Sequence, residues 1–492
     1  MSLEALFPDR PQPAKPVRLT IRRRLLGRGA RLRTLGVAAG LLSLGLTYGL
    51  PAHASTKNWI GPNTLTDWYA NSTFWSTTGF PQASDDAVNS ALTKPMTLGA
   101  DTSVNSFFSN SAFTLNGGAF SGSQLNSAST IQVNNVFTLN GGTINNFTLN
   151  AGVQQAGGPA PSSVVVTSNL STLSNTIVNA NVDMTNPNAY LRLLNANTVN
   201  GAITMATTSH GLDIYNTNDS LTLSATGSLT GFGNVYQDGS GGFLVNNGLV
   251  SANVSGKTLS LGQSNFATTG ATQVTKGATL NVTSTSFTQT AGLTQVDGVL
   301  NLVNAPLALK GGVLDGSGTI NGNVVNTGGT VSPGDSPGTL TINGNYTQGS
   351  AGSLNIEFLG TQNGQHDLLN ILGLSALTGT LDVNYLGNGS GLAVGSQFAF
   401  LDYGTLSAPT VGGLTQYFLN ETPLTSNTGT VVGHNGFTYE LINDTASKML
   451  DLQVLTVGAP AVPEASTTVS LGLLLALGMG GLVVASKRKK KA

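Results

Sequence analysis

Two copies of one six-residue run lie 24 residues apart in the chain. The first is Phe113-Thr114-Leu115-Asn116-Gly117-Gly118, and the second is Phe137-Thr138-Leu139-Asn140-Gly141-Gly142. In each run apolar and polar residues alternate, as on a strand with one buried face, and the Asn-Gly-Gly end is typical of a turn. The runs therefore predict two equivalent short strands, each closed by a tight corner.

Related runs recur along the chain at a similar spacing. Phe147-Thr148-Leu149-Asn150 follows the second copy, and Ala278-Thr279-Leu280-Asn281-Val282 is echoed twenty residues later by Gly298-Val299-Leu300-Asn301-Leu302. A repeat of about 20 to 24 residues indicates a solenoid, in which each coil packs on its neighbours. Between Thr56 and Val457 no long stretch has helical apolar spacing, so the coils are expected to consist of strands.

Composition selects the type of solenoid. The 492 residues include 63 Gly, 61 Thr and 47 Asn. Threonine and other β-branched residues suit strands, while Gly and Asn tolerate the left-handed backbone of corners. We therefore expect an all-β fold, a right-handed parallel β-helix in which Asn side chains can stack in ladders between coils. A string of β-sandwiches is the competing fold.

Charge is concentrated at the two ends of the chain. Residues 1–54 hold nine basic and two acidic residues, whereas residues 55–486 hold seven basic and twenty acidic ones, a net charge of −13. This acidic body is a poor partner for nucleic acid. The chain has no Cys, which excludes disulfide frameworks and thiolate metal sites.

The N-terminal 54 residues have the features of a secretory signal peptide. Seven arginines between positions 18 and 33 precede the uncharged run 34–50, and Ala52 and Ala54 are small residues at the −3 and −1 positions. We expect the export machinery to recognise this segment and signal peptidase to cleave after Ala54. An uncleaved membrane helix is the alternative, and the Sec and twin-arginine routes both stay open.

The C-terminus has three parts: a linker over 458–467, an apolar segment over 468–486 and a basic tail over 487–492. The uncharged run 469–485 would span roughly 26 Å as a helix, enough for one short membrane crossing. Basic residues favour the cytoplasmic side, which places the body outside the membrane. The tail comprises Lys487, Arg488, Lys489, Lys490 and Lys491.

This C-terminal arrangement resembles the PEP-CTERM sorting signal of exopolysaccharide-producing Gram-negative bacteria, in which a Pro-Glu-Pro element precedes a helix and a basic tail. The element here is Val462-Pro463-Glu464-Ala465, with Ala465 in place of the second proline. The resemblance implies processing by an exosortase-type membrane protease, followed by release or re-anchoring outside the cell.

The body resembles the β-helical passenger repeats of PEP-CTERM proteins and autotransporters. The resemblance rests on an opening segment with all three Trp and on a later segment around Gly328 to Leu340. The opening motifs are Asn58-Trp59-Ile60-Gly61, Asp67-Trp68, Trp75-Ser76, Pro81 and Asp85-Asp86-Ala87. The implied organisation is a cap with the first coils over 55–110, repeats over 111–345 and terminal coils over 346–457.

The candidate catalytic groups of the body are the acid pair Asp85 and Asp86 and the arginine Arg192. Asp85 and Asp86 are adjacent, so on a strand they point to opposite faces and are not expected to act together. Arg192, the one arginine of the body, could serve as a base or a carboxylate clamp, but its alternating context is more typical of a solvated outward side chain. We therefore predict no catalytic residue.

Metal and cofactor motifs give no stronger signal. His210, His366 and His434 are far apart and in turn-like contexts, and no zinc-type histidine spacing occurs. The loops beginning at Asp238 and Asp315 look like calcium loops but lack the downstream bidentate acid, so they are interpreted as turns. Gly334-Asp335-Ser336 lies between prolines and fits a rigid corner. No metal and no cofactor is predicted.

These features together predict an exported, non-enzymatic cell-surface or matrix protein with a structural or adhesive role. It would be anchored transiently in the inner membrane by its C-terminal helix, and its surface hydroxyls and amides could contact extracellular polysaccharide. The alternative is a β-helical polysaccharide lyase or hydrolase, which convergence of three acids with Arg192 or a lysine in one groove would favour. A third option is a membrane-retained adhesin that is never processed.

Overall fold

A computed structural model describes residues 55–456 apart from short gaps. The gaps are 78, 124–128, 152–162, 240, 335–336, 361, 363, 387–392, 407–413, 420–421, 424–429 and 433–437. The predicted signal peptide with Ala52 and Ala54, the Val462-Pro463-Glu464-Ala465 element, the apolar segment 468–486 and the basic tail all lie outside the described residues. Within the described part, no helix has the length and apolar character needed to cross a bilayer.

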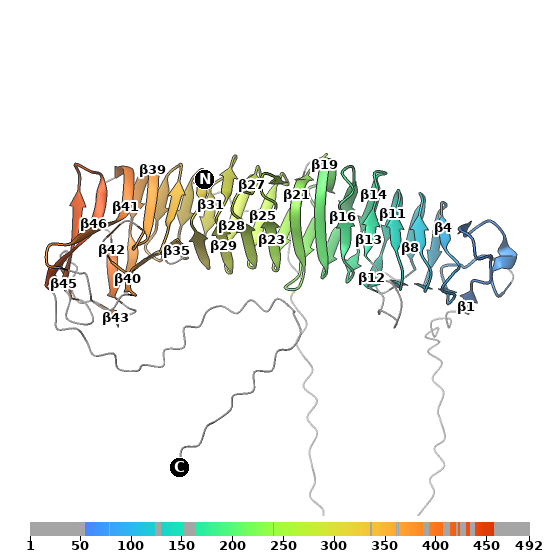
Figure 1. The fold of residues 1–492 in the computed structure, drawn as a ribbon. Helices are drawn as coiled ribbons and strands as arrows, with labels where there is room; N and C mark the ends of the chain where they lie inside the picture. Colours follow the sequence, from blue (N-terminus) through green and yellow to red (C-terminus); the bar gives the residue numbers. More distant parts are fainter. Residues whose placement is uncertain are drawn as a thin grey trace, which may run out of the picture. The chain divides into compact units, whose positions relative to one another are not determined.

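The described chain forms an all-β parallel solenoid, which confirms the predicted class (Figure 1). Each coil supplies strands to three parallel ladders. Ladder 1 contains β1 (Ser55–Asn58), β3 (Asp85–Asn89), β6 (Ser106–Ser109), β9 (Ser129–Val133), β12 (Phe147–Ala151), β15 (Ile177–Val178), β18 (Ala196–Val199), β20 (Ser220–Leu223), β22 (Phe243–Asn246), β25 (Asn265–Thr268), β28 (Ser286–Gln289), β31 (Leu307–Leu309), β34 (Val324–Asn326) and β37 (Tyr346–Gln348).

Ladder 2 lies next in each coil. It contains β2 (Thr66–Asp67), β4 (Met96–Leu98), β7 (Phe113–Leu115), β10 (Phe137–Leu139), β13 (Val164–Val166), β16 (Val182–Met184), β23 (Leu249–Ala252), β26 (Ala271–Val274), β29 (Leu293–Val296), β32 (Val313–Gly316), β35 (Thr330–Pro333), β38 (Ser353–Phe358), β40 (Gly379–Tyr385) and β42 (Leu414–Leu419).

Ladder 3 completes the coil. It contains β5 (Thr102–Val104), β8 (Ala119–Gly122), β11 (Gly142–Asn145), β14 (Ser171–Ser174), β17 (Leu191–Leu194), β24 (Thr258–Leu261), β27 (Thr279–Val282), β30 (Val299–Leu302), β33 (Thr319–Asn321) and β36 (Thr339–Ile342). Longer strands bend from one ladder into the next: β19 (Ala202–Ile214) and β21 (Ser228–Tyr236) join ladders 2 and 3, and β39 (Leu368–Leu377) and β41 (Gln397–Leu406) join ladders 3 and 1.

The two copies of the six-residue run pair in register. Phe113 lies opposite Phe137 and Leu115 opposite Leu139, and all four side chains point into the solenoid while the threonine between them points out. The same alternation continues in the later coils, where Leu280 stacks between Leu259 and Leu300. Burying each such leucine contributes about 1.5–3 kcal/mol, so the stacked interior is the main source of stability.

Corners between strands depend on Asn and Gly. Asn146, Asn175 and Asn195 have φ near +55°, and the Nδ2 of Asn175 donates to the Oδ1 of Asn146 across one coil at 2.7 Å. A second Asn ladder links Asn301, Asn321 and Asn343 by two hydrogen bonds of 2.7 Å. The predicted stacking of Asn between coils is therefore present. At Gly142, φ is +80° and a Cβ would lie 2.6 Å from the carbonyl oxygen of Gly118.

Aromatic side chains cover the interior at the N-terminal end of the solenoid. Around the short 3-10 helix η1 (Ser72–Phe74), all three Trp are buried. The ring of Trp68 lies 4.7 Å from that of Trp75 and 5.5 Å from that of Phe107, and Trp59 packs against Trp75 at 5.2 Å. These rings fill the space that a preceding coil would otherwise fill.

The C-terminal end departs from parallel stacking. Parallel pairing continues to β41 and β42, after which β46 (Met449–Thr456) pairs antiparallel with β41 and with β45 (Thr438–Asp444). The short strands β43 (Thr422–Pro423) and β44 (Thr430–Val432) also pair antiparallel, with β42 and β45 respectively. The segment predicted as terminal coils, 346–457, thus combines coils with antiparallel strands. The sequence repeats do not predict this change.

Replacing Trp68 by Ala tests the capping role. Loss of a fully buried indole in contact with four aromatic rings should cost about 3–5 kcal/mol, and the loss should be local because coils interact with their neighbours. Hydrogen exchange should accelerate in residues 55–122. The control Leu65→Ala, at a residue 63% exposed, should leave exchange unchanged. Equal exchange in Trp68→Ala and the parent would contradict the capping role.

Candidate functional site

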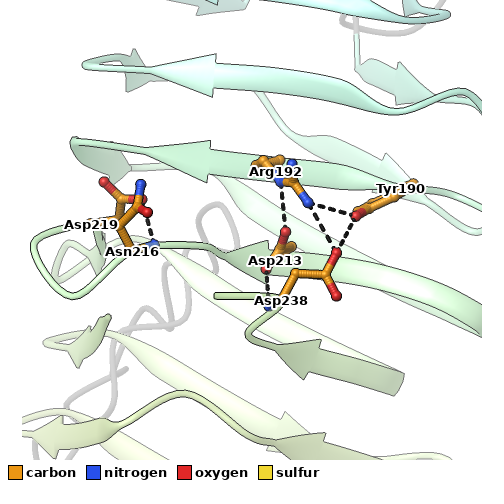
Figure 2. A network of polar contacts seen from close by, with 6 residues as sticks. All are labelled: Tyr190, Arg192, Asp213, Asn216, Asp219 and Asp238. Atoms are coloured by element: carbon orange, nitrogen blue, oxygen red, sulfur yellow. Dashed lines mark hydrogen bonds and ion pairs between the residues drawn. The ribbon is translucent and has the colours of Figure 1, made fainter. Parts of the chain in front are cut away.

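Arg192 lies at the centre of a polar cluster on the outside of ladder 3. In the strand register it stands opposite Thr172 in the preceding coil and Asp213 in the following one. Its Nε donates to the Oδ2 of Asp213 at 2.7 Å, and its Nη2 donates to the Oδ2 of Asp238 at 3.0 Å (Figure 2). The side chain points outward as predicted, but it is ion-paired and only 19% exposed. The prediction of a solvated arginine was therefore wrong.

Two tyrosines hold the guanidinium in place. The hydroxyl of Tyr190 accepts from Nη2 of Arg192 and donates to Asp238, each at 2.9 Å. The guanidinium carbon of Arg192 lies 4.0 Å from the ring centroid of Tyr215, a cation–π contact. Asp213 also accepts from the backbone N–H of Asp238 at 3.1 Å. We call Tyr190, Arg192, Asp213, Tyr215 and Asp238 the Arg192 cluster.

A bulge brings a histidine to the edge of the Arg192 cluster. The register of β19 against β21 shifts between Ala206 and Gly211, so the residues between them leave the ladder. The imidazole of His210, in this bulge, stacks on the ring of Tyr190 with centroids 4.9 Å apart and planes 14° apart. The bulge is tied to the coil before it, since Thr208 N–H donates to the Pro187 carbonyl at 2.7 Å.

Burial controls the protonation of the Arg192 cluster. It raises the pKa of Asp213, which is fully buried, and Arg192 opposes this effect. Burial is the largest single effect on Arg192 and favours its neutral form, but the hydrogen bond to Asp213 and the charges of Asp213, Tyr190 and Asp238 together outweigh it, so the pKa of Arg192 is raised. Burial also raises the pKa of Tyr190 and of the neighbouring Tyr236. Arg192 therefore stays charged and both phenols stay protonated at neutral pH, which makes all three poor general bases.

The adjacent acids Asp85 and Asp86 serve separate turns. Asp85 accepts from the hydroxyl of Ser55 and from the Gln82 N–H, whereas Asp86 accepts from the Asn105 amide and the Ser106 hydroxyl. The two carboxylates share no partner among these contacts. On β3 Asp85 is buried and Asp86 is not, as expected for neighbours on opposite faces of a strand.

The remaining candidates are the Asp315 loop and the residues around Gly334, His366 and His434. Asp315 accepts a hydrogen bond from the Gly316 N–H in its own turn at 2.5 Å. His366 is a separate case, in which burial lowers the pKa of the imidazole. Asp335, Ser336 and His434 lie outside the described residues. Among the residues that the structure describes, no group of three or more His, Cys, Asp or Glu could hold a metal ion.

Sequence reasoning missed Asp367, which is the most perturbed carboxyl in this part of the fold. Its Oδ1 accepts from the Gly338 N–H at 2.9 Å and its Oδ2 accepts from the Glu357 N–H at 2.8 Å, with 1% of the residue exposed. Burial raises the pKa of Asp367 to about 7, and the charges of Glu357 and Asp315 add to the effect. No local motif signals this, because its donors lie 29 and 10 residues away.

No protein-family model matches the chain, and no curated protein matches it either.

The buried carboxyl of Asp367 predicts an unusual pH dependence. Its folded pKa of about 7 lies above the unfolded value of about 3.9, so the folded state binds the proton more tightly. Its contribution to the unfolding free energy is therefore greatest below about pH 4 and falls by about 4 kcal/mol as the pH rises to 7.

Thermal unfolding of the parent and Asp367→Asn at pH 5 and pH 8 measures this contribution. The amide gives up one backbone hydrogen bond at both pH values but does not titrate. The parent should therefore lose stability relative to the variant between pH 5 and pH 8, and comparing the two chains cancels the opposing titration of His366. Parallel pH profiles for the two proteins would show that Asp367 does not titrate in this range.

Proposed function

We propose that this chain is an exported, non-enzymatic surface or matrix protein with a structural or adhesive role. The observation that carries the proposal is that Arg192 already forms ion pairs within the chain. The one arginine of the body is bound by Asp213, Asp238 and Tyr190, so a candidate catalytic base or clamp is already occupied. Around it, in-register ladders run along the solenoid, an architecture that suits display of a surface over many coils.

Sequence features at the two ends support the route to the outside. The proposal includes recognition by the export machinery, cleavage by signal peptidase after Ala54 and a transient inner-membrane anchor over 468–486. An exosortase-type membrane protease then acts near Val462-Pro463-Glu464-Ala465, with Lys487 to Lys491 holding the helix end on the cytoplasmic side. The final location is the cell surface or extracellular matrix, and right-handed winding of the solenoid belongs to the same proposal.

A polysaccharide lyase or hydrolase is the second candidate, and one observation favours it. Arg192, two carboxylates and Tyr190 converge on one surface, as catalytic groups do. Two properties count against it: the raised pKa of Tyr190 disfavours a phenolate base, and Asp213 is committed to Arg192. A hydrolase of the usual kind needs two carboxylates with separate roles.

Protein recovered from outside the producing cells tests the proposal with two readouts. Intact-mass analysis should show a chain that begins at Ser55 and lacks the residues after about Pro463. An exported pool that still ends at Ala492 would contradict the sorting proposal. Substituting Ala for the five basic residues of the tail, Lys487 to Lys491, should reduce the exported pool, because positive charge no longer fixes the helix orientation.

The second readout is polysaccharide turnover by the same exported pool. Incubation with acidic and neutral polysaccharides, with and without calcium, should release no new reducing or unsaturated ends above buffer. Turnover that is abolished by Asp213→Asn or Arg192→Lys would establish the enzyme instead. A matched control is Lys310→Ala, because Lys310 follows β31 in ladder 1 and lies far along the chain from the Arg192 cluster.

A further inference from the structure

Aromatic side chains gather on the outside of the solenoid where the core does not require them. In other strands the outward positions carry Thr or Asn, as in β7 and β27. Around the Arg192 cluster the outward or exposed rings instead include Tyr190, His210, Tyr215 and Tyr236. Packing of the interior does not explain these rings, since the same coils bury a separate set of leucines and isoleucines.

These rings come from successive coils and pack against one another. The ring of Tyr190 lies 4.9 Å from that of His210 and 6.1 Å from that of Tyr236. His210 is exposed and has one ring face against Tyr190, so a sugar ring at this position would stack on the other face of the imidazole.

Polar groups border these rings. Asp238 is bound to Arg192 and Tyr190 through Oδ2, and its side chain remains 50% exposed. Arg192 uses Nε and Nη2 for the two carboxylates, so Nη1 is its remaining donor group. A half-exposed acceptor and a positioned guanidinium donor next to aromatic faces can bind the hydroxyls of a sugar whose C–H face packs on a ring.

Charge selects the kind of sugar. The Arg192 cluster has one positive and two negative side chains, and the body as a whole has a net charge of −13. Both the cluster and the body therefore have a net negative charge, which repels a uronic acid or a sulfated sugar. Because two carboxylates already neutralise the charge of Arg192, its remaining donor offers an anionic group little net attraction. A neutral sugar meets no such repulsion.

We propose that His210, Tyr190, Tyr236, Arg192 and Asp238 form a binding site for a neutral sugar unit of an extracellular polysaccharide. The chemistry of the site carries this inference. That the sugar is extracellular rests on the proposed function, in which the chain is exported from the cell. The bulge in β19 is the element that completes the site, because it places His210 on Tyr190.

Calorimetric titration of the full chain with neutral linear oligosaccharides of glucose, mannose and galactose tests this site. At least one should bind, and His210→Ala and Asp238→Asn should each weaken binding about tenfold by removing a stacking face or an acceptor. His210→Phe should retain the affinity within about twofold, because it keeps a flat ring. The control Phe243→Ala removes an aromatic residue that is 43% exposed but belongs to ladder 1, and should not change the affinity.

Three outcomes would overturn the inference. They are no binding of any neutral oligosaccharide, binding that the His210 and Asp238 variants leave unchanged, and preferred binding of an oligogalacturonate over the neutral sugars. Variants that lower the melting temperature of a protein that binds no sugar would identify the Arg192 cluster as a purely structural clip. None of these results bears on processing of the tail or on polysaccharide turnover, so failure here is separable from failure of the proposed function.

Discussion

In-register hydrogen bonding between successive coils is the constraint on which the rest of this structure depends. Each strand pairs with its equivalents in the coils before and after it, so a residue's orientation is inherited from coil to coil. A slip of one residue would turn a buried stack such as Leu259, Leu280 and Leu300 toward solvent. Corners must therefore repeat as closely as the strands do, which explains the left-handed Asn residues and the close approach at Gly142.

The same constraint creates the features that interrupt the repeat. A parallel stack has two open ends, and here three Trp cover the first coils while β46 adds antiparallel pairing to the last ones. Within the stack, a strand can be longer than its partner only if the extra residues leave the ladder as a bulge. The residues between Ala206 and Gly211 form such a bulge. A bulge changes which side chains face outward, so such an interruption is where specific chemistry can arise.

The sequence predicted the repeating parts well because they are local. The six-residue runs identify their own strands, and their spacing of 24 residues is the register in which Phe113 and Phe137 pair. The Arg192 cluster could not be predicted, since Asp213 and Asp238 lie 21 and 46 residues from Arg192 and meet it only through coil length and the bulge. The perturbed carboxyl of Asp367 could not be predicted for the same reason, because its two hydrogen-bond donors come from different coils.

Distances between spin labels test the stacking directly. Thr138, Thr204 and Gln295 follow one ladder, with seven coil steps from Thr138 to Gln295 and four from Thr204 to Gln295. At about 4.8 Å per step, labels on these pairs should give narrow distributions centred near about 34 Å and about 19 Å. Broad distributions, or distances that do not grow with the number of coils, would contradict a rigid in-register solenoid.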